Sequence, residues 1–401
     1  MSEEPPPRRW PRRLVVAAVI LVVLFYGGGG WYFSDLIHER GLSGEARRRA
    51  LDFEPTTEIV ALDGDPAAAA TVTLAVTDDA GSVDVDGFWG LRWADGYAQL
   101  GGITERGDGT VTRAMILVEG QPPDVGDGAE LDFRAWPSPP ATQAPLEEIA
   151  IPGPLGDYPA WFVPGAEGAP MWAIVVHGNA MTRLDGARLL PPLEAAGIPS
   201  LTITYRNDPG APEDPSGLLR YGLTEWEDLE AAVAYAADRG AERVMLIGLS
   251  MGGGIVMAFL QRSELAGLAG PVVLDAPMLD FSETVDDSAA RETLPLIGLP
   301  MPSSLTAVAK RIADARFDVR WEELDYLEDR RAYDGTPFLV YHGVKDATVP
   351  IATSRRFARL EPDAVTLVQC PEADHLECWN VDTDRYVREF QVFLDQTTSA
   401  P

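Results

Sequence analysis

Three side chains that could together carry out acyl transfer occur in the order Ser250, Asp346 and His375. Ser250 stands in the pentapeptide Gly-Leu-Ser-Met-Gly, after an apolar run and before a stretch of helical periodicity. A serine hydroxyl is a weak nucleophile that must be held exposed beside a base, and a sharp strand-to-helix turn does this. The glycines two residues to either side let the backbone approach itself closely in such a turn. We therefore predict that Ser250 is a nucleophile.

The base can be found by elimination, because the chain has four histidines. His38 lies beside an apolar N-terminal segment, while His177 precedes Ser250 and His342 precedes the candidate acid. His375 alone follows both, in a loop after the last expected strand. In the fold that carries a nucleophile elbow of this type, the chain order is serine, acid, histidine, so we predict that His375 is the general base.

For the acid, Asp346 lies in the segment HGVKDATVP, at the C-terminal end of an expected strand. Asp275, which ends another expected strand, is a competing candidate because that strand could also supply an acid. Asp374 is a weak candidate, since it is adjacent to His375 in sequence and its side chain is expected to point elsewhere. We predict Asp346.

Two backbone N–H groups should stabilise the oxyanion that forms when the serine attacks a carbonyl. One is expected from Met251, directly after the nucleophile. The other is expected from the loop His177-Gly178-Asn179-Ala180, with Asn179 as first choice and Ala180 as second. His177 itself is predicted to have a structural role, with its ring stabilising this loop.

The two cysteines of the chain, Cys370 and Cys378, flank His375. In an oxidising compartment a disulfide between them would close the loop that carries the base. The alternative is a pair of unrelated buried thiols, because cysteine is commonly buried. We predict the disulfide, because the two cysteines flank one functional loop.

The elements that must position these residues alternate between strand and helix from residue 146 onward, which indicates a parallel sheet with crossover helices. The segments 148–151 and 160–163 read as an antiparallel edge pair. The stretch 279–333 is too long for one crossover and predicts a cap insertion. The strand candidates are WAIVV (172–176), SLTITY (200–205), RVMLIG (243–248), PVVLD (271–275), PFLVY (337–341) and VTLVQ (365–369).

The N-terminus has the pattern of a membrane anchor. A basic tail (1–13) precedes the uncharged apolar run 14–33, whose length is sufficient to cross a bilayer. A cleaved signal peptide is the rival interpretation, but no small-residue cleavage site follows the apolar core. The basic tail favours a cytoplasmic N-terminus and an extracytoplasmic catalytic domain, although arginines at 40 and 47–49 weaken the asymmetry. The charged segment 34–55 is expected to be a stalk.

Between stalk and catalytic domain, residues 56–137 show short alternating runs broken by Gly, Asp and Pro, which predicts a small antiparallel β module. Its expected strands are 71–77, 96–103 and 111–120. We find no catalytic constellation in it, and it could bind an unknown partner. The segment 137–145 is rich in proline and reads as a linker to the catalytic domain at 146–397.

Composition restricts the classes of function. The apolar fraction of 46% over 401 residues allows a sizeable core. The formal net charge of −30 argues against binding of nucleic acid, because a phosphate backbone requires clustered Lys and Arg. Charge does not indicate the fold or the substrate.

At these motifs the sequence resembles the α/β-hydrolase superfamily over residues 146–397. The segments WAIVVHGN, GLSMGG, HGVKDATVP and EADHLECW occur in the family's order. More narrowly, YRND (205–208) and YGLTEWEDLEAAV (221–233) look like membrane-anchored bacterial hydrolases of the prolyl-oligopeptidase-like and acyl-hydrolase branches. The resemblance implies an α/β fold with a mostly parallel sheet, helices on both faces and a cap. It implies neither a metal nor an organic cofactor.

The expected activity is therefore hydrolysis of an ester through an acyl-enzyme, on a small-molecule acyl substrate. A serine peptidase acting on short peptides is an alternative, although no group that would anchor a peptide terminus is identifiable. A catalytically silent, membrane-tethered binding protein is a second alternative from a different class, and the intact Ser, Asp and His argue against it.

Overall fold

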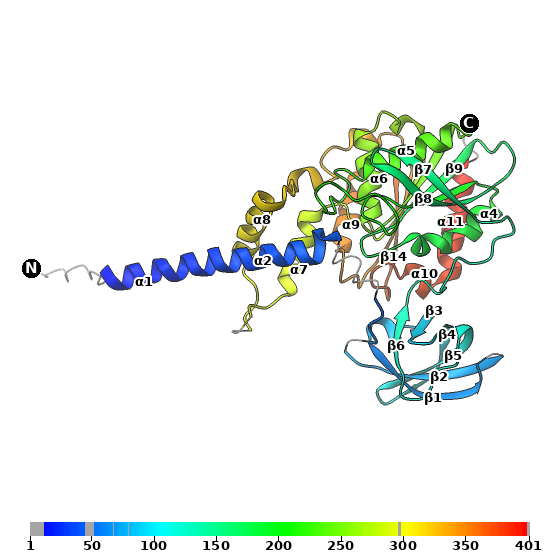
Figure 1. Ribbon diagram of the computed structural model, residues 1–401, viewed down its shortest axis with the longest axis horizontal. Coiled ribbons are helices and arrows are strands. Elements are labelled where there is room, and N and C mark those ends of the chain that lie inside the picture. Colours follow the sequence, from blue (N-terminus) through cyan, green and yellow to red (C-terminus); the bar gives the residue numbers. More distant parts are fainter. Residues whose placement is uncertain (1–11, 45–51, 67, 79, 296–297, 399–401) are drawn as a thin grey trace, which may run out of the picture.

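The computed structural model describes residues 12–44, 52–66, 68–78, 80–295 and 298–398. It has three parts: a long N-terminal helix, a small β-barrel and a larger α/β domain. The barrel packs against one end of the α/β domain, and the helix projects away from both (Figure 1). Most of the basic tail, and the three arginines at 47–49, lie outside the described residues.

The N-terminal helix is continuous over Arg12–Leu42, a length of 31 residues. Its segments are α1 (Arg12–Val23), η1 (Leu24–Gly28), α2 (Gly29–Ile37) and η2 (His38–Leu42). None of the side chains of α1 is buried. At the other end Leu42 is buried in the main core of the α/β domain, and its carbonyl accepts a hydrogen bond from the Leu219 N–H at 2.8 Å. Residues 34–42, which were expected in a stalk, are thus a packed part of the α/β domain.

Two of the glycines of the apolar run explain how this helix packs. A Cβ at Gly30 would lie 2.7 Å from Val308 Cγ1, and one at Gly29 would lie 3.3 Å from a methyl group of Leu305. Small residues at such positions allow two helices to approach closely. By contrast, a Cβ at Gly27 or Gly28 would meet nothing within 4 Å.

The six strands of the barrel close in the order β1-β2-β5-β4-β3-β6 and pair antiparallel. They are β1 (Thr57–Asp65), β2 (Ala69–Ala75), β3 (Trp89–Trp93), β4 (Gly96–Gly107), β5 (Thr110–Gly120) and β6 (Gly128–Asp132), with a 3₁₀ turn η3 (Gly81–Asp84). Alternate side chains of β2 and β5 are buried, as expected when one face of a strand lines a core. The three strands expected from the sequence are present as β2, β4 and β5, whereas β1, β3 and β6 were not predicted.

The sheet of the α/β domain has eight strands in the order β14-β13-β12-β11-β9-β10-β8-β7. They are β7 (Glu147–Gly153), β8 (Gly156–Val163), β9 (Met171–Val176), β10 (Ser200–Ile203), β11 (Arg243–Leu249), β12 (Ala269–Asp275), β13 (Phe338–Gly343) and β14 (Val365–Cys370). Strands β7 and β8 form the antiparallel edge pair, and β8 is also antiparallel to β10. The six strands from β9 to β14 are parallel to one another. Every residue of β9 is buried, as expected for a strand covered on both faces.

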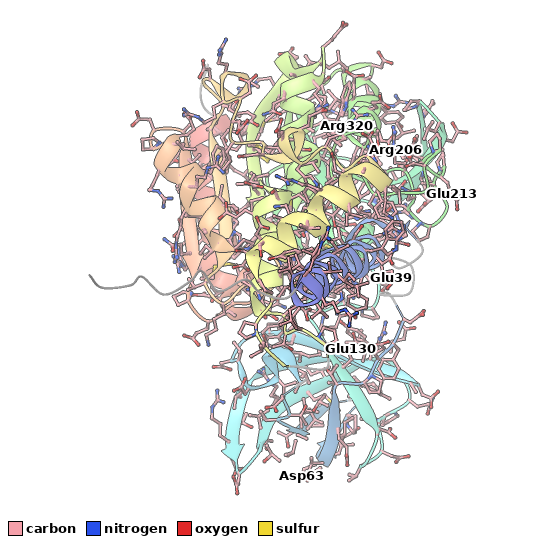
Figure 2. The ribbon with its side chains drawn as sticks, turned by 90° about the vertical axis from the view of Figure 1, so that its left-hand side faces the viewer. Glu39, Asp63, Glu130, Arg206, Glu213 and Arg320 are labelled. Atoms are coloured by element: carbon pink, nitrogen blue, oxygen red, sulfur yellow. A yellow bond between two sulfur atoms is a disulfide. The ribbon has the colours of Figure 1, made fainter. Side chains whose placement is uncertain are left out.

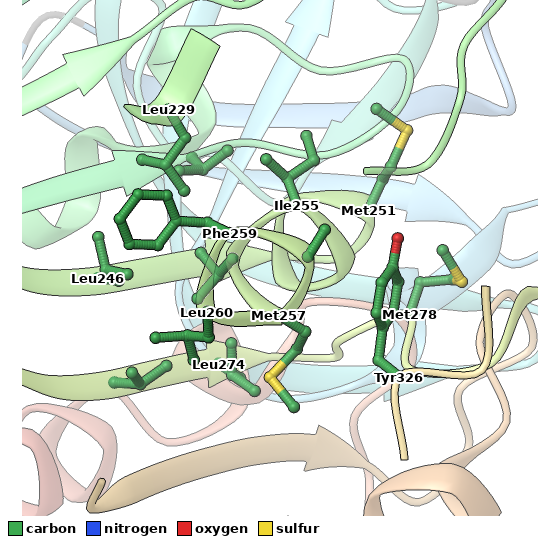
Figure 3. Close-up of a cluster of buried hydrophobic side chains, with 14 of the residues drawn as sticks. Leu229, Leu246, Met251, Ile255, Met257, Phe259, Leu260, Leu274, Met278 and Tyr326 are labelled. Carbon is green, nitrogen blue, oxygen red and sulfur yellow. The ribbon is translucent and has the colours of Figure 1, made fainter. Parts of the chain in front are cut away.

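Helices cover both faces of this sheet. The first face packs against α5 (Trp226–Ala237), α6 (Met251–Arg262) and α9 (Ile351–Leu360). The second face packs against α4 (Leu190–Ala195), α10 (Cys378–Val381) and α11 (Thr383–Thr398). Short 3₁₀ turns are η4 (Arg183–Leu189) and η5 (Ala266–Leu268). Figure 3 shows the first face, where Phe259 of α6 lies between Leu229 of α5 and Leu246 of β11.

The cap predicted at 279–333 contains α7 (Phe281–Arg291), α8 (Ser303–Phe317), η6 (Trp321–Leu324) and η7 (Arg331–Tyr333). In Figure 1, α7 and α8 lie beside α2. Figure 2 looks along the N-terminal helix, in which Glu39 is near the C-terminal end, and the barrel, which carries Asp63 and Glu130, lies below the α/β domain in this view. Tyr326 fastens the cap to the core, because its hydroxyl donates a 2.7 Å hydrogen bond to the Tyr221 carbonyl.

Candidate active site

Ser250 lies on the turn between β11 and α6 with φ +53° and ψ −119°. Positive φ is rare in residues with a Cβ, and such strain persists where the surrounding structure enforces it. Backbone hydrogen bonds hold Ser250 in place, because its N–H donates to the Asp275 carbonyl at 2.9 Å and its carbonyl accepts the Met278 N–H at 3.0 Å. The backbone is closely packed at this turn: a Cβ at Gly248 would lie 2.7 Å from the Gly252 carbonyl oxygen, and one at Gly252 would collide with the carbonyl oxygen of Val176. The two glycines of the motif therefore permit the close backbone approach that the sequence predicted.

The structure brings the three predicted side chains together in one chain of hydrogen bonds. His375 Nε2 lies 2.9 Å from Ser250 Oγ, and His375 Nδ1 lies 2.8 Å from Asp346 Oδ2. The other oxygen of Asp346 accepts the backbone N–H groups of Thr348 and Val349 at 2.9 and 2.7 Å. The carboxylate is thereby fixed in orientation and directs the ring of His375 at the serine.

The electrostatic interactions within this series of hydrogen bonds keep the carboxyl group of Asp346 ionised. Burial acts to raise the pKa of Asp346, but the charge of His375 and hydrogen bonds from His342 and His375 hold it well below its ordinary range. Burial acts to lower the pKa of His375. The charge and hydrogen bond of Asp346, together with the charges of Asp275 and Asp374, outweigh burial and raise this pKa above its ordinary value. A neighbouring carboxylate thus favours the imidazolium that forms when His375 takes a proton.

The two competing acids have other partners. Asp275 is fully buried and accepts from Arg188 at 2.9 Å and from the Tyr386 hydroxyl at 3.1 Å. Asp374 Oδ1 accepts the backbone N–H groups of Ala347 and His375, both at 2.7 Å. Asp374 therefore ties the loop of the acid to the loop of the base.

The loop expected to complete an oxyanion hole follows β9. His177 Nε2 lies 2.8 Å from Asp208 Oδ2, and the Tyr205 hydroxyl donates to the Gly178 carbonyl at 2.9 Å. These contacts hold the backbone that leads to Asn179, and they give His177 the loop-stabilising position expected from the sequence. Asp208 and Tyr205 occur in the YRND segment, but no pattern in the sequence connects them with His177.

The second expected donor, Met251, occupies the first turn of α6. The first N–H groups of a helix have no partner within the helix and lie at the positive end of its dipole. The Met251 N–H is therefore suited to bind a developing negative charge beside Ser250.

The base loop is closed by a disulfide between Cys370 and Cys378. It is also held by Arg188, whose guanidinium donates to the Leu376 carbonyl at 3.0 Å. Leu376 has φ +62°, so the residue after His375 is strained like the nucleophile. Nothing in the sequence marked Arg188 for this role, because it lies 188 positions away in η4.

The β-barrel contacts the same loop. Asn380 of α10 donates to the carbonyls of Phe88 and Phe133 at 2.9 and 2.8 Å, and the Asn380 carbonyl accepts the Phe88 N–H. Ser82 donates to Glu377 at 2.7 Å. A Cβ at Gly87 would collide with the carbonyl of Asn380, so glycine is required there. The barrel, in which no catalytic group was predicted, thus borders the loop of the base.

Two family models match the sequence. The model described as the alpha/beta hydrolase family matches residues 162–391, more than half of the chain. A second model, described as a domain of unknown function, matches residues 58–132, the extent of the barrel. Within the described part of the chain, no group of three or more His, Cys, Asp and Glu side chains is arranged to hold a metal ion.

Among curated proteins, the chain is similar to the uncharacterized protein YfhR of Salmonella typhimurium, with 25% identity over 277 residues, 64% of this chain and 83% of that protein. Among solved structures, the esterase Pf2001 of Pyrococcus furiosus is 17% identical, with a TM-score of 0.48 over 63% of this chain and 93% of that one. The serine hydrolase XC6422 of Xanthomonas campestris is 17% identical, with a TM-score of 0.42 over 65% and 100% of the two chains.

Proposed function

The chain belongs to the alpha/beta hydrolase family, as its motifs predicted, and from this premise we propose that it is a membrane-anchored serine hydrolase of carboxylic esters. The observation that carries the proposal is the hydrogen-bonded series Ser250–His375–Asp346, with both bonds under 3 Å. A nucleophile, a base within reach of it and an acid that orients the base are the parts that acyl transfer requires.

In the proposed reaction, His375 Nε2 takes the proton of Ser250 as Oγ attacks the ester carbonyl. Asp346 holds the imidazole in the orientation with Nδ1–H toward the carboxylate and stabilises its cation. The N–H groups of Met251 and Asn179 bind the tetrahedral oxyanion. His375 then gives its proton to the leaving alcohol, which departs as the intermediate collapses to an ester of Ser250.

The second half of the reaction repeats these roles with water. His375 removes a proton from a water molecule, and the resulting nucleophile attacks the ester of Ser250. Collapse of the second tetrahedral intermediate releases the carboxylic acid and returns the proton to Ser250 Oγ. No cofactor takes part in either half.

We assign the N-terminal helix to a membrane. It is apolar, exposed along α1 and long enough to span a bilayer. The disulfide between Cys370 and Cys378 favours an oxidising compartment for the catalytic domain, in agreement with an extracytoplasmic orientation.

The test is covalent labelling of the full chain in detergent by a fluorophosphonate probe, together with turnover of p-nitrophenyl butyrate. We expect Ser250→Ala to lose both labelling and turnover, while Ser303→Ala, an exposed serine at the start of α8, keeps both. Turnover by Ser250→Ala equal to that of the wild type would overturn the proposal. Faster cleavage of the matching p-nitroanilide than of the ester would favour the peptidase alternative.

A further inference from the structure

A cavity of about 380 Å³ lies between the N-terminal helix and the cap, and its volume falls in the range of ligand pockets. It extends to the catalytic loops, because its lining includes Asn179 and Thr348. Asn179 is the proposed oxyanion donor, and the Thr348 N–H donates to Asp346. An acyl group whose carbonyl lies at Ser250 therefore has this cavity as a place for its chain.

Three helices present regularly spaced faces to the cavity. The N-terminal helix contributes residues at 33, 36, 37, 40 and 41, which is the spacing of one helical face. Helix α7 contributes the same pattern at 281, 284, 285, 288 and 289, and Glu292 follows directly after its end; α8 contributes 306 and 309. The wall formed by the N-terminal helix is fixed in place, because Phe33 packs in a buried cluster with Leu305 and Ala309.

The lining is suited to an apolar group. Its charged members among the described residues are Arg40 and Glu292, which form an ion pair with each other at 2.6 Å. Both are partly exposed, so they satisfy one another at the solvent side and offer no free charge to a ligand. The remaining lining consists of aliphatic, aromatic, small and neutral polar side chains. A hydrocarbon chain can therefore enter without leaving a charge unpaired.

The cavity also lies where the helix would leave a membrane. The apolar run 14–33 is long enough to cross the hydrocarbon layer, and it ends at Phe33, the first residue of the helix that lines the cavity. Leu299, in the loop before α8, has 59% of its surface exposed. Trp31 and Tyr32, at the end of the apolar run 14–33, have 54% and 52% of their surfaces exposed, and amphipathic aromatic rings are typical of the level of the lipid headgroups.

We propose that the N-terminal helix, besides anchoring the enzyme, forms one wall of an acyl-chain pocket, and that the substrate is a long-chain, single-acyl ester taken from the membrane. This inference rests on the proposed ester hydrolase function. The chain of the ester lies among α2, α7 and α8, its carbonyl lies at Ser250, and the leaving alcohol is on the side away from the cavity.

The first experiment compares p-nitrophenyl dodecanoate with p-nitrophenyl butyrate, using the full chain in detergent. Ala289→Phe places a ring in the cavity, whereas Ala290→Phe makes the same change at the neighbouring exposed residue, outside the lining. We expect Ala289→Phe to lower kcat/KM for the dodecanoate by about tenfold or more and to leave the butyrate within about twofold. Ala290→Phe should leave both esters unchanged.

The second experiment tests the source of the substrate. The enzyme is placed in phosphatidylcholine nanodiscs, and a monoacylglycerol is supplied either in the same discs or in separate discs. We expect hydrolysis to be at least about tenfold faster when enzyme and substrate share a disc.

Each failure has a distinct signature. Unchanged ester selectivity in Ala289→Phe, with fluorophosphonate labelling and butyrate turnover intact, would overturn the acyl pocket and leave the hydrolase proposal standing. Equal rates in shared and separate discs would overturn the membrane source. Absence of fluorophosphonate labelling of the wild-type enzyme would instead contradict the proposed hydrolase function itself.

Discussion

The β-barrel and the N-terminal helix are two additions to the α/β domain that meet it on different sides of the candidate site. The barrel contacts the base loop through directed hydrogen bonds, with Asn380 donating to two barrel carbonyls. The helix contacts the cap through close apolar packing, with Gly30 against Val308 and Phe33 in a buried cluster.

The difference between these contacts predicts a division of labour. Hydrogen bonds fix a loop in one orientation, so the barrel contact should position His375 and affect every substrate equally. Apolar packing sets the shape of a pocket, so the helix contact should affect substrates according to the length of their acyl chain. The following predictions test whether the two additions are separable in this way.

The largest effect should come from Asp346, because it orients His375 for every substrate, whatever the barrel or the helix contributes. Asp346→Asn leaves an amide that can still accept from Thr348 and Val349 but no longer stabilises the imidazolium of His375. We expect kcat to fall by about 10⁴ for butyrate and dodecanoate alike. Steady-state kinetics on both esters measure this, and a loss restricted to one ester would show that the acid is not shared.

Breaking the barrel contact should give an intermediate effect. Asn380→Leu removes two hydrogen bonds and leaves the carbonyls of Phe88 and Phe133 without their donor, at a cost of about 1–3 kcal/mol each. We expect kcat to fall about tenfold on both esters, because the loop of His375 loses its support.

The matched control for this contact is Thr73→Val, which removes the hydrogen bond between Thr73 and Thr112 inside the barrel, away from the base loop. It should lower the melting temperature of the barrel with little change in kcat. An equal loss of kcat in the two variants would mean that barrel stability in general, and not the Asn380 contact, supports the site.

A smaller effect is expected in the pH profile. The raised pKa of His375 means that the base is protonated and inactive below a pH somewhat above the ordinary histidine value, so kcat/KM should fall as the pH drops through that pKa. Asp374→Asn keeps an acceptor for the N–H groups of Ala347 and His375 but removes one of the charges that raise this pKa. The acid limb of the profile should move to lower pH, equally for both esters. A shift to higher pH, or none, would contradict this account of the base.

The smallest kinetic effect should follow loss of the disulfide. Replacing Cys370 and Cys378 by serine frees an eight-residue loop and should lower the free energy of unfolding by about 2 kcal/mol, with a fall in melting temperature. Kcat should change by less than about threefold, because Asn380 and Arg188 still hold the loop. Combining the serine pair with Asn380→Leu should cost more than the product of the separate effects, since the two constraints hold one loop.

The sequence predicted well what local pattern encodes. The elbow at Ser250 could be placed because a strand, a glycine-flanked serine and a helix are adjacent in the chain, and chain order then selected His375. The short alternating runs between Gly, Asp and Pro also predicted the strands β2, β4 and β5. Strand β3 was missed because Trp89–Trp93 is buried at nearly every position and shows no alternation.

What escaped prediction depends on contacts between distant segments. Residues 34–42 carry many charges and resemble a solvated stalk, yet Leu42 enters the core and Arg40 pairs with Glu292, 252 positions away. Asn380 and Arg188 are ordinary residues of a short helix and a 3₁₀ turn, and their roles come from carbonyls that only the fold brings near. The spacing of residues in the sequence does not indicate such contacts between distant segments.

The unbroken course of the N-terminal helix has one last consequence. At 1.5 Å per residue its 31 residues measure about 46 Å, whereas the hydrocarbon layer takes up about 30 Å. The remainder is clamped to the α/β domain with no flexible joint, since its final residue is in the core. In a bilayer, the nucleophile would therefore work at a fixed height above the lipid and sweep a plane by lateral diffusion, reaching bonds at that level and passing over those that lie deeper.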